Sequence, residues 1–179
     1  MKVSLNTVQR LIGFDLPEVS ELVDTINRRL GGVEDTYELA DKYRGALVVH
    51  VVTVEKHPNA DRLRVCLVDD GGAARGVERN EDGLVQVVCG APNVHDGMFA
   101  IWLPPNTTVP STHATAEPFV LAKRELRGVV SNGMLAAADE LAIGSDHEGI
   151  IELTERPSVS YRSTVSCCGT GFCRTVRSR

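Results

Sequence analysis

Residues 46–69 read ALVVHVVTVEKHPNADRLRVCLVD, and this stretch decides the fold. Its first ten residues are rich in Val and other β-branched side chains, and residues 63–69 alternate in character, so both segments predict β-strands. The segment His57-Pro58-Asn59 between them is typical of a turn, because Pro58 keeps His57 extended and Asn59 can bond to nearby backbone amides. The stretch therefore predicts two strands joined by a structured turn.

The strand pattern continues beyond this stretch. Apolar runs follow at residues 84–89 and 98–103. Turn residues separate the runs at Gly71-Gly72, Gly90-Ala91-Pro92-Asn93 and Pro104-Pro105-Asn106. Short strands at this spacing predict a small all-β barrel, to which residues 119–138 should add a further strand or two before a helical turn at 138–142. The polar stretch at residues 72–83 is interpreted as a solvated hairpin loop.

The N-terminal 44 residues have a different pattern. Apolar residues recur there at helical spacing in two stripes, Leu5, Val8, Leu11, Ile12 and Val19, Leu22, Val23, Ile26, Leu30. Pro17 suits the first turn of the second helix, and Gly31-Gly32 should end it. A short strand is expected at residues 33–37. The pattern predicts a small helical segment over residues 1–44.

The composition limits the classes of function. The chain has 179 residues, 42% hydrophobic but only 4% aromatic, so the core must be aliphatic. The net charge of −5 argues against non-specific binding to a nucleic-acid backbone, although a local basic patch stays possible. We see no apolar run long enough for a membrane span and no signal peptide, and we expect a cytoplasmic protein. The odd count of five Cys then points to free thiols.

The C-terminal end differs again. Residues 156–179 contain five Arg and no Asp or Glu, and they hold three of the five Cys. This end is either a basic RNA-binding tail or, as we prefer, a poorly ordered segment, because no apolar period is visible. We therefore separate residues 154–179 as an atypical tail.

Four segments together carry a family resemblance. They are residues 54–66 (VEKHPNADRLRVC), 86–94 (QVVCGAPNV), 123–135 (KRELRGVVSNGML) and 140–144 (ELAIG). Their order and spacing resemble the tRNA-binding OB domain of phenylalanyl-tRNA synthetase beta subunits, some methionyl-tRNA synthetases and stand-alone tRNA-binding proteins. The start of the chain, MKVSLN followed by two helices, is similar to that of bacterial phenylalanyl-tRNA synthetase beta subunits.

The resemblance implies an α+β fold. It places a five-stranded OB-fold β-barrel at residues 45–153, preceded by a helical segment that forms the first half of a split domain. The family pattern stops near Glu155, and family members are several times longer, so the resemblance implies a truncated product or a fragment.

The resemblance also implies a function. The chain would bind tRNA by shape and backbone, in support of phenylalanine attachment to tRNA. Its partners would be tRNA and the synthetase alpha subunit, with no membrane. ATP and magnesium would belong to the full enzyme only, and no cofactor is expected here. The alternative is a free-standing OB-fold protein that binds a protein partner or self-associates.

Chemistry by the chain alone is not expected, because no nucleophile–base motif, CxxC spacing or other metal motif is visible. The densest basic cluster outside the tail is Lys123, Arg124 and Arg127, which is either an RNA contact or a solvated strand face. Ser131 and Asn132 offer groups suited to RNA edges, whereas Met134 suits an apolar contact or the core. The full set of candidate tRNA-binding residues is Lys56, Arg62, Asn93, Lys123, Arg124, Arg127, Ser131, Asn132 and Met134. Arg64, close to Lys56 and Arg62 in sequence, offers a further phosphate contact. For the turn at residues 57–61, and for Asn93, a structural role is the stronger interpretation.

Overall fold

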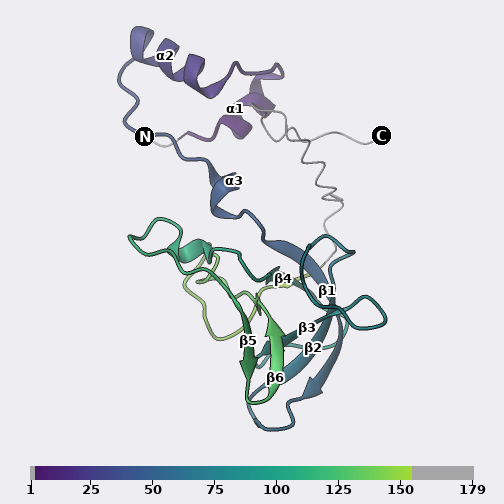
Figure 1. Ribbon diagram of the computed structural model, residues 1–179. Coiled ribbons are helices and arrows are strands. Elements are labelled where there is room, and N and C mark those ends of the chain that lie inside the picture. The colour runs from purple at the N-terminus through teal and green to yellow at the C-terminus, as the bar shows by residue number, and fades with distance from the viewer. Residues whose placement is uncertain (1–2, 155–179) are drawn as a thin grey trace. The chain divides into compact units, whose positions relative to one another are not determined.

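The computed structural model describes residues 3–154 and contains helices and strands in separate parts of the chain (Figure 1). The helices are α1 (Leu5–Ile12), α2 (Val19–Arg29) and α3 (Leu39–Lys42), and a single 3-10 turn, η1, covers Pro110–Thr112. The strands are β1 (Leu47–Lys56), β2 (Arg64–Asp69), β3 (Val85–Cys89), β4 (Phe99–Leu103), β5 (Lys123–Leu126), β6 (Val129–Asn132), β7 (Met134–Leu135) and β8 (Glu152–Leu153). The chain divides into two compact units, one up to Leu39 and one from Ala40.

The N-terminal unit holds the two predicted helices. Helix α1 begins after Ser4, whose Oγ accepts a hydrogen bond from the Thr7 amide (3.4 Å), and it ends at Gly13, which has a left-handed φ of 74°. Neither α1 nor α2 has a buried residue, and Leu11 and Leu30 are 80% and 85% exposed. No residue of the two apolar stripes is fully buried among the described residues: Leu11, Ile12 and Leu30 are exposed, and the others are half-buried.

The strand expected at residues 33–37 does not form, and that prediction is wrong. A strand needs a partner for its backbone groups, and this segment bonds to side chains instead. The Val33 amide donates to Asn27 Oδ1 (2.6 Å), and the Thr36 amide donates to Asp35 Oδ1 (2.8 Å). The apolar residues here are too few to recruit a neighbouring strand.

The second unit is an antiparallel sheet in the order β3-β2-β1-β4-β7, with β8 also paired to β4 and β5–β6 as a separate hairpin. The four strands predicted between residues 46 and 103 are confirmed, and residues 119–138 supply β5, β6 and β7. The expected helical turn at 138–142 forms a hydrogen-bonded turn but no helix. The chain therefore has the predicted α+β class.

The backbone ladder does not close into a five-stranded barrel, because β3 and β7 remain the two ends of the sheet. Side chains bridge the gap between β3 and β6. Ser131 Oγ accepts from the Val88 amide (2.9 Å), and Asn132 Nδ2 donates to the Gln86 carbonyl (3.1 Å). Gln86 Nε2 donates in turn to the Val130 carbonyl (2.7 Å). We call this set of contacts the seam. It satisfies backbone groups on β3 that would otherwise be unpaired at a free edge.

Two apolar clusters fill the second unit. The larger one is built mainly of Val side chains from β1, β2 and β3, with Trp102 fully buried among them. Trp102 Nε1 donates to the Asn132 carbonyl (2.8 Å), which ties this core to β6. The smaller cluster contains Leu103, Val109, Leu121, Ala136 and Leu141. The aliphatic core expected from the composition is present.

Cys66 and Cys89 are buried free thiols, as expected, and burial raises the pKa of Cys66 to about 12. The other three Cys lie outside the described residues. The prediction that residues 156–179 are poorly ordered also concerns residues outside the described range. Between residues 3 and 154, no helix has the length and apolar character needed to cross a membrane.

Candidate nucleic-acid interface

The connection between β1 and β2, residues 57–63, is built around the buried side chain of His57. Its Nδ1 accepts a hydrogen bond from the Asn59 amide (3.1 Å), which places the ring proton on Nε2. Nε2 then donates to the Leu126 carbonyl at the end of β5 (2.9 Å). The expected structural role of this turn is confirmed, and it extends further than a local turn, because it binds a distant hairpin.

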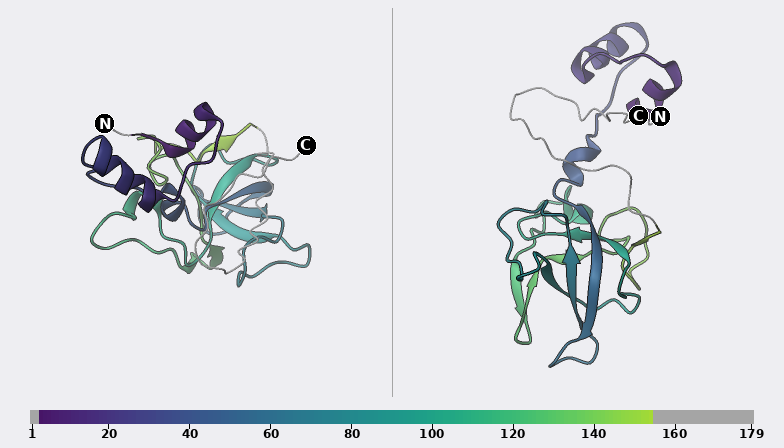
Figure 2. Two further views of the ribbon diagram at one scale, coloured as in Figure 1. Left: turned by 90° about the horizontal axis from the view of Figure 1, so that it is seen from above. Right: turned by 90° about the vertical axis from the view of Figure 1, so that its right-hand side faces the viewer.

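The tip of the β5–β6 hairpin is held by the same connection. Arg127 and Gly128 both have left-handed backbone conformations, with φ of 50° and 90°, as a two-residue hairpin turn of type I′ requires. This conformation is uncommon for Arg. Asn59 Nδ2 donates to the Arg127 carbonyl (2.9 Å), and Arg127 Nη1 donates to the Asn59 carbonyl (3.4 Å). We call this set of contacts the clamp, and it fixes Arg127 beside the 57–63 connection. Figures 1 and 2 show the tip of the β5–β6 hairpin at the same end of the sheet as the connection between β1 and β2.

Four cations gather at this end of the sheet, and we call them the basic rim: Lys56, Arg62, Arg64 and Arg127. Lys56 and Arg64 are direct cross-strand partners on β1 and β2. Like charges in that position repel each other. Within residues 3–154, none of the four lies within ion-pair distance of a carboxylate. Asp61 accepts from Arg64 only through its backbone carbonyl (3.4 Å).

Two cations of the basic rim, Arg62 and Arg64, line a shallow hollow of about 280 Å³. Its lining comes from the 57–63 connection, from β2 and from the turn after β3, with Asp61, Arg62, Arg64, Gly90, Ala91 and Pro92. Two cations without an ion-pair partner on a concave surface are suited to a polyanion.

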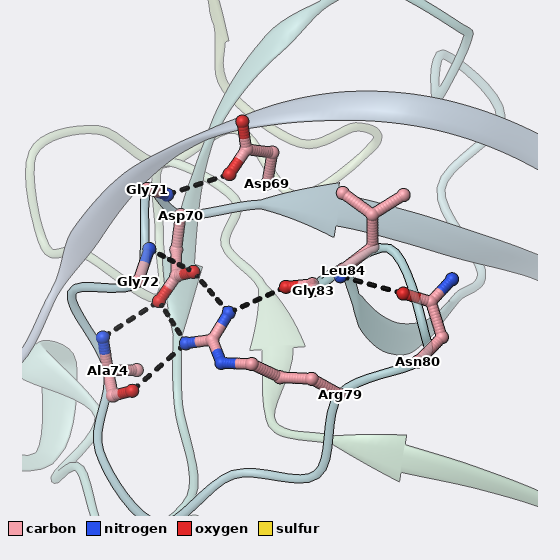
Figure 3. Close-up of polar contacts among 9 residues, drawn as sticks. All are labelled: Asp69, Asp70, Gly71, Gly72, Ala74, Arg79, Asn80, Gly83 and Leu84. Atoms are coloured by element: carbon pink, nitrogen blue, oxygen red, sulfur yellow. Dashed lines mark hydrogen bonds and ion pairs between the residues drawn. The ribbon is translucent and has the colours of Figure 1, made fainter.

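The opposite connection, residues 70–84 between β2 and β3, places its charges differently (Figure 3). The Asp70 carboxylate is fully buried and forms a bidentate ion pair with Arg79 (2.6 and 2.9 Å). Arg79 also donates to the carbonyls of Gly83 and Ala74, both at 2.9 Å. Residues 72–83 form the predicted hairpin loop, and most of them are exposed, but Arg79 gives the loop an ordered internal network with Asp70.

Burial alone would raise the pKa of the Asp70 carboxyl. The hydrogen bonds from Arg79 and from the amides of Ala74 and Gly72 outweigh that effect, so its pKa lies below the ordinary value. Asp70 in turn raises the pKa of Arg79. Both charges are thus held by each other, and neither is available to a ligand.

The predicted basic cluster on β5 does not stay together in the structure. Lys123 forms an ion pair with Glu78 of the 70–84 connection (2.5 Å). Arg124 lies over the ring of Phe119, 5.9 Å from its centroid. Only Arg127 joins the basic rim, which also contains the predicted Lys56 and Arg62.

The polar candidates on β6 and near β3 have structural partners. Ser131 and Asn132 are 3% exposed and belong to the seam, so they offer no surface to RNA edges. Asn93 uses both ends of its amide on Ile150, accepting from its amide (3.0 Å) and donating to its carbonyl (2.9 Å). Gly149 has no room for a Cβ, which would lie 2.6 Å from Asn93 Oδ1. These three candidates are better assigned to holding the fold.

Met134 packs against the smaller apolar cluster and lines a second hollow of about 280 Å³. Glu140 lies in the same hollow, where burial raises the pKa of its carboxyl although the Ala137 amide donates to it (2.7 Å). The core alternative for Met134 fits this position, and its contact with RNA stays a prediction.

The chain matches the family model described as "Putative tRNA binding domain" over residues 47–160. That match covers more than half of the 179 residues.

The chain belongs to this tRNA-binding domain family.

The match begins at Leu47, the first residue of β1, so the whole sheet and the basic rim lie within the tRNA-binding domain. Helices α1, α2 and α3 precede it. The sequence places Lys56, Arg62 and Arg64 together beside the 57–61 turn, and the structure adds Arg127 to them through the clamp. The position of Arg127 next to these three cations was not predicted, because it depends on contacts between residues 68 positions apart.

The tRNA-binding domain is homologous to part of several phenylalanine–tRNA ligase beta subunits. The chain is 37% identical over 153 residues to that of Nitrobacter winogradskyi and 38% identical over 155 residues to that of Rhodopseudomonas palustris. It is also 38% identical over 157 residues to that of Chlorobaculum tepidum. These alignments cover 86–87% of the chain but only 17–18% of the relatives. The alternative of a free-standing interaction protein is not favoured by this likeness.

Among solved structures, a mutant RNA ligase of Naegleria gruberi overlaps 59% of this chain and 31% of its own, at 14% identity. The TM-score of 0.40 is too low to show a shared fold.

Proposed function

We propose that the second unit binds tRNA through the basic rim, by contacts to phosphates and by overall shape. The observation that carries this proposal is the position of Lys56 opposite Arg64, next to the clamped Arg127, with no carboxylate of residues 3–154 in ion-pair distance. Repulsion between these cations costs stability in the free protein. A phosphate backbone that lies between them would relieve the repulsion.

The acidic net charge of the chain fits a local site of this kind. A net charge of −5 opposes broad attraction to nucleic acid, so binding must depend on a few placed cations. The clamp favours defined placement, because the backbone beside Arg127 is held at two points. Recognition by shape and backbone rather than by base edges follows from such a site.

The test is a titration of fluorescently labelled tRNA at several salt concentrations. The Lys56→Gln/Arg64→Gln double variant should weaken binding. It should also reduce the steepness of the slope of log affinity against log salt concentration by roughly 1.4 to 1.8, the value for the loss of two phosphate contacts. The matched control is Arg29→Gln/Arg75→Gln, which removes the same charge from exposed positions outside the basic rim. Equal losses in both variants would show that total charge, and not the basic rim, determines binding.

We also propose that the sheet works as an OB-fold barrel closed by the seam. Contacts between β3 and β6 side chains take the place of a backbone ladder. Ser131→Ala should then loosen the barrel by leaving the buried Val88 amide unpaired, which costs about 1–3 kcal/mol of unfolding free energy. Hydrogen exchange at β3 and β6 would report the change.

The apolar faces of α1 and α2, which contain no fully buried residue and expose Leu11, Ile12 and Leu30, support a second proposal, that the two helices form the first half of a split domain completed by further chain. The relatives are more than five times as long as the matched segment, so they have sequence that could cover these faces. Native-state hydrogen exchange should show stronger protection of α1 and α2 in a full-length relative than in this chain. Equal protection would contradict the proposal.

At the level of the whole enzyme, we propose that the chain serves phenylalanine attachment to tRNA in the cytoplasm, beside an alpha subunit that carries the active site. Between residues 3 and 154, no three His, Cys, Asp or Glu side chains gather to hold a metal ion. We propose that ATP and magnesium act in the full enzyme.

A further inference from the structure

Phe119 is an unusual residue in a chain with so few aromatics. Its side chain leaves the residue 46% exposed, whereas the other described aromatics from Ala40 onward, Tyr43, Phe99 and Trp102, are half-buried or buried. A single exposed apolar residue is normal at a protein surface, so exposure by itself does not indicate a site. The support of the Phe119 backbone and the cation beside its ring are what distinguish this residue.

The backbone around Phe119 is held on both sides. Its amide donates to Thr112 Oγ1 (2.8 Å), and its carbonyl accepts from the Val109 amide (2.9 Å). Leu121, two residues later, is buried in the smaller apolar cluster and exchanges backbone hydrogen bonds with Asn106 and Thr107. A ring on such a support is positioned before any ligand arrives, which lowers the entropic cost of binding.

Arg124 lies over this ring, 5.9 Å from its centroid, within the distance of a cation–π contact. Arg124 is itself exposed, and it forms no ion pair with any carboxylate of residues 3–154. Its neighbour Lys123 differs, because Glu78 neutralises it. Phe119 and Arg124 thus combine an aromatic face, a planar cation and an uncompensated positive charge.

We propose that Phe119 and Arg124 form a stacking platform for an unpaired base of RNA. This inference rests on the proposed tRNA-binding function and adds the kind of nucleotide that is bound. Unpaired bases in loops and at ends expose the faces that stack on aromatic rings and guanidinium planes, whereas bases within a duplex do not. The phosphate of the same nucleotide would face the charge of Arg124. A neutral apolar partner would leave that charge uncompensated, which favours the nucleotide.

The test uses a single-stranded RNA oligonucleotide with a central 2-aminopurine, the same oligonucleotide annealed to its complement, and labelled tRNA. The wild-type chain should quench 2-aminopurine fluorescence in the single strand and not in the duplex. Phe119→Leu keeps an apolar side chain but removes the ring. It should abolish the quenching and weaken tRNA binding by about fivefold or more, the low end for loss of one base stack. The salt dependence should not change, because Phe119 releases no counterion.

Phe119→Tyr is the conservative variant and should keep both the quenching and the affinity. Thermal unfolding of each variant shows whether the fold is intact. If Phe119→Leu folds and behaves like the wild type toward tRNA and the single strand, the platform does not exist and the ring serves a protein contact or the fold. If the wild-type chain fails to bind tRNA at all, the proposed function itself is wrong.

Discussion

Strand β2 is entered through residues 57–63 and left through residues 70–84, so these two connections lie at its opposite ends. Both carry several charged residues in sequence. In the second connection two charged pairs form, because Asp70 binds Arg79 inside the loop and Glu78 neutralises Lys123 of β5. Arg75, Glu81 and Asp82 of this connection are exposed and form no ion pair within residues 3–154. In the first connection, hydrogen bonds of His57 and Asn59 hold the backbone, and the cations of the basic rim find no carboxylate among residues 3–154.

The difference shows that the density of charge along a sequence does not identify a binding site. What matters is whether the fold supplies each charge with a partner. A connection that satisfies its own charges stabilises the protein, and a connection that leaves them without a partner can serve a ligand. The two connections should therefore respond differently to substitution, in stability on one side and in binding on the other.

The largest expected effect is on stability, from Arg79→Met. This change leaves the buried carboxylate of Asp70 without its ion-pair partner, and we expect a loss of about 3 kcal/mol in the free energy of unfolding. Urea unfolding measures it. Arg75→Met, an exposed change in the same connection, should alter stability by no more than about 0.5 kcal/mol. At a temperature where Arg79→Met is folded, its tRNA affinity should equal that of the wild type. A clear loss of tRNA affinity would show that the 70–84 connection also contributes to binding.

A second effect concerns pH. The pKa of Asp70 in the folded protein lies below its ordinary value of 3.8, so its contribution to stability is complete above that value. The contribution is lost as the pH falls through the lowered pKa. Asp70→Asn should thus be less stable than the wild type near pH 7, by about 2 kcal/mol for the weakened hydrogen bonds to a charged group. The gap should narrow below about pH 4, as Asp70 of the wild type becomes protonated. Unfolding curves from pH 7 to pH 2 for both proteins would show this, and a gap that stays constant would mean that the ionised carboxylate is not the stabilising group.

A smaller change in stability, with a change in binding, is expected from Asn59→Ala in the other connection. The variant removes one hydrogen bond to the Arg127 carbonyl, at a cost of about 1 kcal/mol. Because Arg127 is then less well held, tRNA binding should weaken several-fold. Asn80→Ala removes an exposed side chain that bonds to the amides of Asp82 and Leu84 in the opposite connection, so it serves as the control and should leave binding unchanged. If Asn59→Ala binds tRNA as tightly as the wild type, the clamp does not contribute to tRNA binding.

The strands and the helices could be predicted from sequence because their signals are local. The alternation in residues 63–69 and the Val-rich run before it are enough to specify β1 and β2. The strand expected at residues 33–37 fails for the opposite reason, since a strand depends on a partner that the local sequence does not contain. The structural role of the 57–61 turn was also readable, because Pro and Asn have defined turn chemistry.

The candidate site was only partly predictable, because the fate of a polar side chain depends on residues distant in sequence. Ser131 and Asn132 look suited to RNA in isolation, but Val88 and Gln86 take their hydrogen bonds across the seam. Lys123 likewise forms an ion pair with Glu78, which neutralises its charge. Conversely, the register of β1 and β2 places Arg64 opposite Lys56, and the fold places Arg124 over the ring of Phe119. None of these pairings follows from spacing along the chain.

The most direct test of the contrast is to map the tRNA contact on the isotopically labelled chain by amide chemical shifts during a tRNA titration. We predict that the largest shifts occur at residues 55–64 and 124–130, around the basic rim and the β5–β6 hairpin, with little change at residues 70–84. Adding salt should reverse the shifts. Shifts centred on residues 70–84, with the 57–63 connection unaffected, would contradict the account.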